Sequence, residues 1–218
     1  MTALRIDFVS DVVCPWCAIG LTSLEQALRR LDGEVQADIH FQPFELNPQL
    51  PVEGESIAEH LQRKYGLTEA QLEENQERIR QRGAELGFAF DFNARSRIWN
   101  TFDAHRLLHW AGIEGKQSEL KHALLRAYFS EGRNVSDREV LAGIAAGAGL
   151  DAQRAREVLA SGDYADDVRA AEQFFQSLGI SGVPAVIIEK RHLVSGGQPP
   201  EVFERALREI AAVKQDAP

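Results

Sequence analysis

The chain of 218 residues contains only two cysteines and has no long run of apolar residues. A transmembrane helix needs about 18–20 consecutive apolar residues, so the sequence offers no candidate membrane span. Cationic residues are in the minority, with 24 Lys and Arg against 33 Asp and Glu and a formal net charge of −9. Because such a surface repels phosphate groups, we expect neither nucleic acid nor a membrane as a partner.

The small number of cysteines excludes the disulfide framework of a small exported protein, which needs several cysteines spread along the chain. The first 13 residues lack the basic leader and the long apolar run of an export signal, which favours a cytoplasmic location. A zinc site would usually need a second cysteine pair or closely spaced histidines. His105 and His109 are four residues apart, but we interpret them as ordinary histidines and expect no metal.

The two cysteines occur together in the motif Cys14–Cys17, which reads Cys-Pro-Trp-Cys. Before it, residues 4–8 alternate between apolar and polar side chains, which predicts a strand. After it, leucines at 21, 24, 28 and 31 have helical spacing, and residues 35–42 alternate as a second strand. A helical crossover between the two strands implies that they are parallel. The motif therefore opens a helix directly behind a strand.

This position suits redox chemistry. Unpaired N–H groups at a helix start carry partial positive charge, which favours a thiolate over a thiol. Pro15 in the first helical turn costs no hydrogen bond, because its N–H would be unpaired there in any case. Trp16 would place a large apolar ring beside the reactive sulfur, where it could help to bind an apolar partner. A pair of inert, buried cysteines with an ordinary core tryptophan is the alternative interpretation.

The middle of the chain has only helical patterns. Thr68 and Gln71 form a candidate capping box, and further helices are predicted at about 96–111, 117–130, 137–147 and 152–160. The pattern then returns to a helix at 164–178, strands at 185–188 and 193–195, and a last helix from Pro200. A tight turn makes the final two strands antiparallel. We expect a discontinuous α/β domain of residues 1–43 and 161–218, with residues 44–160 as an inserted helical domain.

This order, β-α-β, helical block, α-β-β-α, resembles the thioredoxin-like fold with a large all-helical insertion, as in the DsbA-like oxidoreductases. Four segments resemble the FrnE branch of that family, which is related to the 2-hydroxychromene-2-carboxylate isomerases. They are Ser10–Cys17, Phe44–Pro48, Asn100–Arg106 and Ser195–Pro200. One departure is mild: Gly197 stands where relatives often have Ala.

The motif assigns different roles to the two thiols. Cys14 meets the helix end and, we expect, solvent, so it would attack a substrate disulfide. Cys17 lies a helical turn inward and would resolve the mixed disulfide. The resemblance further implies that Pro184 is a cis proline facing the cysteines, with the backbone of Val183 free to pair with a substrate strand. From the residues alone, a trans proline that merely starts a strand is an equal alternative.

The remaining candidates have open alternatives. Asp11 could raise the pKa of Cys17 or accept its proton, or it could be an exposed acid at a strand end. The resemblance implies that Asn100 and Thr101 face the active-site groove. Gly197 and Gln198 could present backbone donors to a carboxylate such as that of glutathione, or could form a simple turn before the last helix.

The first functional hypothesis is a thiol–disulfide oxidoreductase that acts on protein or small-molecule disulfides, working in the cytoplasm as a reductase or isomerase. The second is a glutathione-dependent isomerase or kappa-class-like transferase, although such relatives commonly carry Ser where Cys14 stands. A third is a non-catalytic binding module. We expect no bound cofactor, with glutathione or another thiol as redox partner. The sequence leaves open the natural substrate and whether the protein is a monomer or a dimer.

Overall fold

The structure is a computed structural model that describes residues 1–216. Its elements occur in the following order: β1 (Thr2–Ser10), α1 (Pro15–Arg30), β2 (Val35–Pro43), β3 (Glu55–Ser56), α2 (Ile57–Tyr65), α3 (Glu69–Leu86), β4 (Arg97–Ile98), α4 (Phe102–Ile113), α5 (Gln117–Phe129), α6 (Arg138–Gly147), α7 (Ala152–Ala160), α8 (Ala165–Ser177), β5 (Ala185–Ile188), β6 (His192–Ser195) and α9 (Pro200–Asp216).

The main sheet has four strands in the order β2-β1-β5-β6. Strands β1 and β2 are parallel, as the helical crossover through α1 requires, and Thr2 is in register with Val35. Strand β5 is antiparallel both to β1 and to β6. The predicted thioredoxin-like order β-α-β followed by α-β-β-α is therefore confirmed.

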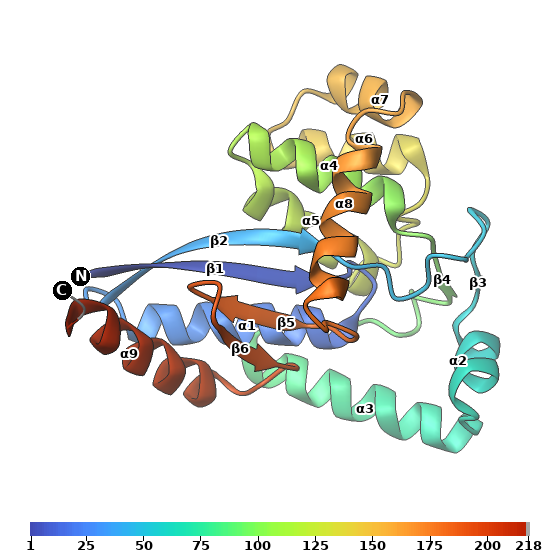
Figure 1. Ribbon diagram of the computed structural model, residues 1–218. Helices are drawn as coiled ribbons and strands as arrows, with labels where there is room; N and C mark the ends of the chain where they lie inside the picture. The colour runs from blue at the N-terminus through green and yellow to red at the C-terminus, as the bar shows by residue number, and fades with distance from the viewer. Residues whose placement is uncertain (217–218) are drawn as a thin grey trace.

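Helices cover both faces of this sheet. Leu4, Ile6 and Phe8 of β1 share one core cluster with residues of α1 and with Phe203 of α9. Val9 belongs to a second cluster with Phe175 of α8. Figure 1 shows α1 and α9 together beneath the sheet and α8 crossing its other side. The carboxyl end of β1 thereby leads directly into the start of α1, where the cysteine motif lies.

The segment between β2 and α8 is mainly helical, with one difference from the prediction. Glu55–Ser56 and Arg97–Ile98 pair as a short antiparallel ladder, so the insertion is not entirely helical. The helix expected from about residue 96 begins only at Phe102, because residues 97 and 98 are held in this ladder. The side chain of Asn100 also accepts the N–H of Phe102 at 3.0 Å, which fixes a non-helical turn before α4.

Helices α2 and α3 form an arm beside the beginning of α1 (Figure 1). The predicted capping box of Thr68 and Gln71 is present at the start of α3. Farther along α3, the carbonyl of Leu86 accepts a hydrogen bond from the Gln26 amide of α1 at 3.0 Å. The largest core cluster runs from β1 and α1 into helices α4 to α7 without a break. The proposed domain boundaries at residues 43/44 and 160/161 stay a prediction.

None of the helices in the described part of the chain combines the length and the apolar composition needed to cross a bilayer.

Candidate active site

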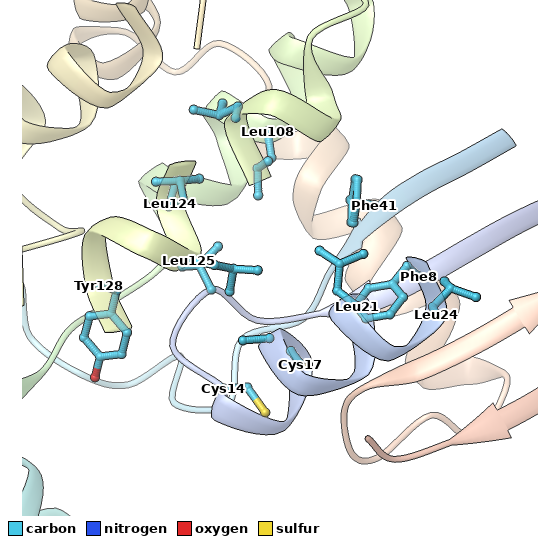
Figure 2. Packing of buried hydrophobic residues seen from close by; sticks show 14 of the residues in the cluster. Phe8, Cys14, Cys17, Leu21, Leu24, Phe41, Leu108, Leu124, Leu125 and Tyr128 are labelled. Carbon is cyan, nitrogen blue, oxygen red and sulfur yellow. The ribbon is translucent and has the colours of Figure 1, made fainter. Parts of the chain in front are cut away.

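Cys14 occupies the N-cap position of α1, and Pro15 is the first helical residue. The N–H of Cys17 donates to the carbonyl of Cys14 at 3.0 Å, so the second cysteine lies one turn into the helix. Both are free thiols. Figure 2 shows both at the beginning of α1, within the cluster that includes Leu21, Leu125 and Tyr128.

The expectation that Cys14 meets bulk solvent is wrong, because its exposed fraction is only 4%, against 0% for Cys17. The loop that carries Val183 lies across it, and the Cys14 thiol donates to the Val183 carbonyl oxygen at 3.7 Å. Cys14 nevertheless lines an open groove, whereas Cys17 does not. The groove therefore gives access to the first sulfur, whereas the second sulfur is covered.

The loop before β5 is fixed closely against α1. The Val183–Pro184 peptide bond is cis. The Pro184 carbonyl accepts the N–H of Gly196 at 2.8 Å. At Gly20 of α1, a Cβ atom would lie 3.0 Å from Cγ of Pro184, so only a glycine lets the loop approach this near. Pro184 is thus placed beside the cysteine motif, as the resemblance implied.

Gly197 also lies against α1. A Cβ at this position would be 3.0 Å from the carbonyl oxygen of Trp16 and 3.2 Å from its ring. The indole of Trp16 itself remains 36% exposed at the edge of the groove. The Gln198 amide donates to the carbonyl of Ser195 at 2.8 Å and so closes the turn before α9. Neither Gly197 nor Gln198 lines the groove, and glutathione binding by them stays a prediction.

The groove has a volume of about 480 Å³ and lies between the start of α1 and the arm formed by α2 and α3. Its lining is predominantly apolar and contains three cationic side chains. These residues line it: Val13, Cys14, Pro15, Trp16, Leu46, Asn47, Ile57, His60, Leu61, Lys64, Tyr65, Leu67, Leu72, Asn75, Gln76, Arg78, Ile79, Phe92, Arg95, Ile98, Tyr128 and Val183.

On the other side of the motif, Asp11 is 1% exposed, so the alternative of an exposed strand-end acid is wrong. Its Oδ2 accepts the N–H of Leu46 at 2.8 Å, and its Oδ1 lies 3.5 Å from Nε2 of His105. Burial alone would raise the pKa of Asp11. The neighbouring His105, with the Leu46 N–H and Thr101, reverses this and lowers the pKa of Asp11 below its ordinary value.

Lys121 of α5 is fully buried within electrostatic reach of Cys17, and its ammonium has no hydrogen-bond partner in the described residues. Burial lowers the pKa of Lys121, although the nearby Cys17, Asp11 and Cys14 favour its charged form. Burial also raises the pKa of Cys17 well above its ordinary value, and the neighbouring Cys14 raises it further. The charge of Lys121 and the backbone of Asp11 oppose this rise. The thiolate form of Cys17 is therefore disfavoured, although Lys121 lies within electrostatic reach of its sulfur.

Asn100 and Thr101 do not line the groove. The Asn100 amide donates to the carbonyl of Leu50 at 3.1 Å, which ties two loops together, and Thr101 is buried next to Asp11. A substrate contact for either residue stays a prediction. His105 faces Asp11, whereas the His109 ring stacks on Tyr164 with centroids 5.3 Å apart. The described residues contain no group of three or more metal-ligating side chains.

Two site residues escaped the sequence analysis. Lys121 shares the buried face of α5 with Leu124, Leu125 and Tyr128, at spacings of three, four and seven residues. A lysine within such an apolar stripe is predictable from the sequence as a buried cation. Arg95 carried no comparable signal, because it lies outside any helix or strand and reaches the groove only through the fold.

A comparison with protein-family models matches residues 5–208 to the DSBA-like thioredoxin domain. The chain therefore belongs to the DsbA-like thioredoxin-domain family. It is 36% identical to a probable DsbA oxidoreductase from Streptomyces coelicolor of known crystal structure. That comparison covers 99% of this chain and 92% of the other, with a TM-score of 0.91.

Two more distant structures share the fold. One is the cytosolic disulfide reductase DsbM from Pseudomonas aeruginosa with GSH, with a TM-score of 0.65 and 16% identity over 95% of this chain and 99% of that one. The other is a 2-hydroxychromene-2-carboxylate isomerase, with a TM-score of 0.70 and 13% identity over 97% of this chain and 98% of that one. At these identities the likeness concerns the fold alone.

Proposed function

We propose that this protein is a thiol–disulfide oxidoreductase in which Cys14 attacks a substrate disulfide and Cys17 resolves the mixed disulfide. The observation that carries the proposal is the asymmetry of the two thiols. Cys14 caps α1 and lines the groove, whereas Cys17 is fully buried beside Lys121. Thiol–disulfide exchange needs this division between an accessible attacker and a second thiol held behind it.

In the first step, the Cys14 thiolate forms a bond to one substrate sulfur, and the substrate disulfide breaks. The electron pair of the broken bond leaves with the other substrate sulfur, which is released as a thiolate. Val183 would hold the substrate beside Cys14, because its N–H and carbonyl make no backbone–backbone hydrogen bond in the described chain. An extended substrate segment can pair with such groups as an added strand.

In the second step, the thiolate of Cys17 attacks the Cys14 sulfur, the bond between Cys14 and the substrate breaks, and the second substrate sulfur leaves as a thiolate. The protein then holds a Cys14–Cys17 disulfide, which two molecules of an external thiol such as glutathione reduce to the dithiol while they are oxidised to a disulfide. The neighbouring Cys14 is one of the causes that raise the pKa of Cys17. Once Cys14 is bound in the mixed disulfide it no longer carries charge, so Lys121 can favour the Cys17 thiolate against less opposition. Cys17 is thereby activated only after Cys14 has reacted.

A glutathione-dependent isomerase is the second candidate, supported by the shared fold with a 2-hydroxychromene-2-carboxylate isomerase. The intact cysteine pair argues against it, since an enzyme that activates the sulfur of glutathione has no need of its own resolving thiol. A cytoplasmic site of action, in the reductive or isomerising direction, fits the fold shared with a disulfide reductase described as cytosolic.

The test is the reduction of insulin disulfides with a thiol donor, using wild type, Cys14→Ser and Cys17→Ser. We expect turnover by wild type, none by Cys14→Ser, and an accumulated mixed disulfide with Cys17→Ser that mass spectrometry detects. Full activity of Cys14→Ser would overturn the proposal. Isomerisation of an aromatic substrate that requires glutathione but neither cysteine would favour the second candidate.

A further inference from the structure

The groove beside Cys14 differs in charge from the rest of the molecule. The chain carries a formal net charge of −9, yet Lys64, Arg78 and Arg95 line the groove and no Asp or Glu does. None of the three forms an ion pair with a carboxylate among the side chains that the structure describes. Unpaired cations in a concave apolar site attract anionic ligands.

Arg95 is held in place without a counter-ion. Its guanidinium lies 4.8 Å from the ring centre of Phe92, 5.3 Å from that of Tyr128 and 5.1 Å from that of Phe129. Its Nε is buried and has no hydrogen-bond partner in the described residues. Desolvation lowers the pKa of Arg95, whereas Tyr128 and Cys14 favour its charge. An aromatic cage thus holds a partly desolvated cation within electrostatic reach of Cys14.

The other two cations lie on the arm. Lys64 of α2 is exposed, and its ammonium donates only to uncharged oxygens, namely the Leu46 carbonyl at 3.0 Å and the Asn47 amide. Arg78 of α3 is also exposed and donates to the side chain of Asn75. Their charges therefore remain available at the edge of the groove, while Arg95 lies within electrostatic reach of the Cys14 sulfur.

Glu55 lies just before α2, a helix that contributes to the lining, and its carboxylate is paired. Glu55 forms a salt bridge with Arg63 at 2.5 Å and contacts the buried His60, whose side chain does line the groove. The hydrogen bond and the charge of Arg63 lower the pKa of Glu55, as do those of His60. Among the described residues, those that line the groove therefore carry the formal positive charges of Lys64, Arg78 and Arg95 and no formal negative charge.

Resting on the proposed function, we propose that the groove binds acidic, apolar peptide segments, and that Arg95 pairs with a carboxylate close to the substrate cysteine. The apolar walls supplied by Leu61, Leu72, Ile79 and their neighbours require apolar side chains to cover them. A small, highly polar disulfide such as oxidised glutathione satisfies the cations but leaves these walls uncovered. The groove therefore selects its substrate by charge and by apolar contact together.

The probes are short peptides of equal length with one cysteine, activated as a neutral 2-pyridyl disulfide and preceded by leucine and valine. The two residues after the cysteine are Glu-Glu, Gln-Gln or Lys-Lys. Cys14 attacks the peptide sulfur, the peptide–pyridyl S–S bond breaks, and pyridine-2-thione leaves with the electron pair and is followed by its absorbance. Dividing each rate by that with 2-mercaptoethanol removes the intrinsic reactivity of each peptide.

We expect the reduced wild-type protein to react about tenfold faster with the Glu-Glu peptide than with the Gln-Gln peptide, as one hydrogen-bonded charge pair gives. The Lys-Lys peptide should be slowest. Arg95→Gln should bring the ratio of acidic to neutral peptide close to one, Arg95→Lys should retain part of it, and Arg156→Gln should leave it unchanged. Arg156 is the matched control because it pairs with Glu139, away from the groove. The ratio of the two rates is compared because an effect of Arg95 on the reactivity of Cys14 toward every peptide cancels in it.

If Arg95→Gln does not fold, the double variant Lys64→Gln with Arg78→Gln at the exposed edge must lower the ratio instead. Equal rates for all three peptides with wild type, each well above the mercaptoethanol rate, would overturn this inference and leave the proposed function intact. If oxidised glutathione reacts as fast as the acidic peptide, the inference that the groove prefers a peptide to a small polar disulfide is overturned. No reaction above the mercaptoethanol rate would instead count against the proposed function.

Discussion

The sulfur of Cys14 lies 3.7 Å from the carbonyl oxygen of Val183, a residue 169 positions away in the sequence. This contact joins the start of α1 to the loop before β5, and the groove opens beside it. The reactive thiol is thus placed by two elements that the chain brings together only when the four-stranded sheet has formed. The chemistry of the site consequently depends on how closely that loop and the turn before α9 rest on α1.

Gly197 is the first point at which this close approach can be tested. Because a Cβ there would lie 3.0 Å from the Trp16 carbonyl, we expect Gly197→Val to lower the free energy of unfolding by about 1–3 kcal/mol. Trp16 should shift with it, changing the tryptophan fluorescence. Gly182→Val is the matched control, since no atom lies within 4 Å of the corresponding Cβ. Equal stability of the two variants in urea would contradict the close packing described for Gly197.

Asp11 provides a pH-dependent prediction. Its pKa in the folded protein is lowered, against the opposing effect of burial, by His105, Leu46 and Thr101. A carboxyl group with a lowered folded-state pKa stabilises the protein above its unfolded-state pKa of about 3.9, and this stabilisation is lost as the pH falls through the folded-state value. We expect Asp11→Asn to cost about 1 kcal/mol at neutral pH, because the hydrogen bond from the Leu46 N–H then loses its charged acceptor.

The measurement is urea unfolding of wild type and Asp11→Asn between pH 7 and pH 3. The difference between them should be greatest at neutral pH and should shrink below about pH 4. Asp32→Asn is the control, because Asp32 is exposed. Asp11 also faces Lys121 and His105, and both variants retain these two residues. A difference that stays constant over the whole range would show that the Asp11 charge is not what stabilises the fold.

Lys121 should set the ionisation of the resolving thiol. Its positive charge favours the Cys17 thiolate, so removing it in Lys121→Met should raise the pKa of Cys17 further. We expect the half-maximal rate of resolution of a preformed Cys14 mixed disulfide to move to higher pH, with slower release at neutral pH. Single-turnover release of a labelled peptide measures this directly. Lys116→Met, which removes an exposed ammonium just before the same helix, should leave the profile unchanged.

An unchanged pH profile in Lys121→Met would mean that the lysine is only a structural feature of the core. A loss of activity at every pH, without a shift, would point to damaged packing. Circular dichroism and the rate of the first step, which involves only Cys14, distinguish these cases.

Much of this architecture could be predicted from local patterns. The alternation in β1 and β2 and the helical spacing between them defined the βαβ unit. Helix α3 was expected from Thr68 and Gln71 because a capping box is a purely local interaction. Helix α4 was expected too early because its start depends on contacts distant in sequence. Residues 97 and 98 instead pair with Glu55–Ser56 as a short antiparallel ladder.

For the same reason, some features of the site could be predicted from the sequence and others could not. The roles proposed for the two thiols rest on their spacing on one helix, but the low exposure of Cys14 depends on a loop that is remote in the sequence. Asp11 was identified as a candidate, yet its burial is decided by Leu46 and His105, which pack over it from other segments. The groove, with its cage around Arg95, has contributions from helices α1, α2, α3 and α5, and no single stretch of sequence contains it.

The most direct test of the account is competitive alkylation of the reduced protein with iodoacetamide at neutral pH, with peptide mapping by mass spectrometry. We predict that Cys14 is modified first, at least about fivefold faster than a free cysteine, of which only a few per cent is thiolate at neutral pH. Cys17 should stay unmodified while the protein is folded. Equal labelling of both thiols, or a Cys14 no more reactive than free cysteine, would contradict the division of labour on which the proposed function rests.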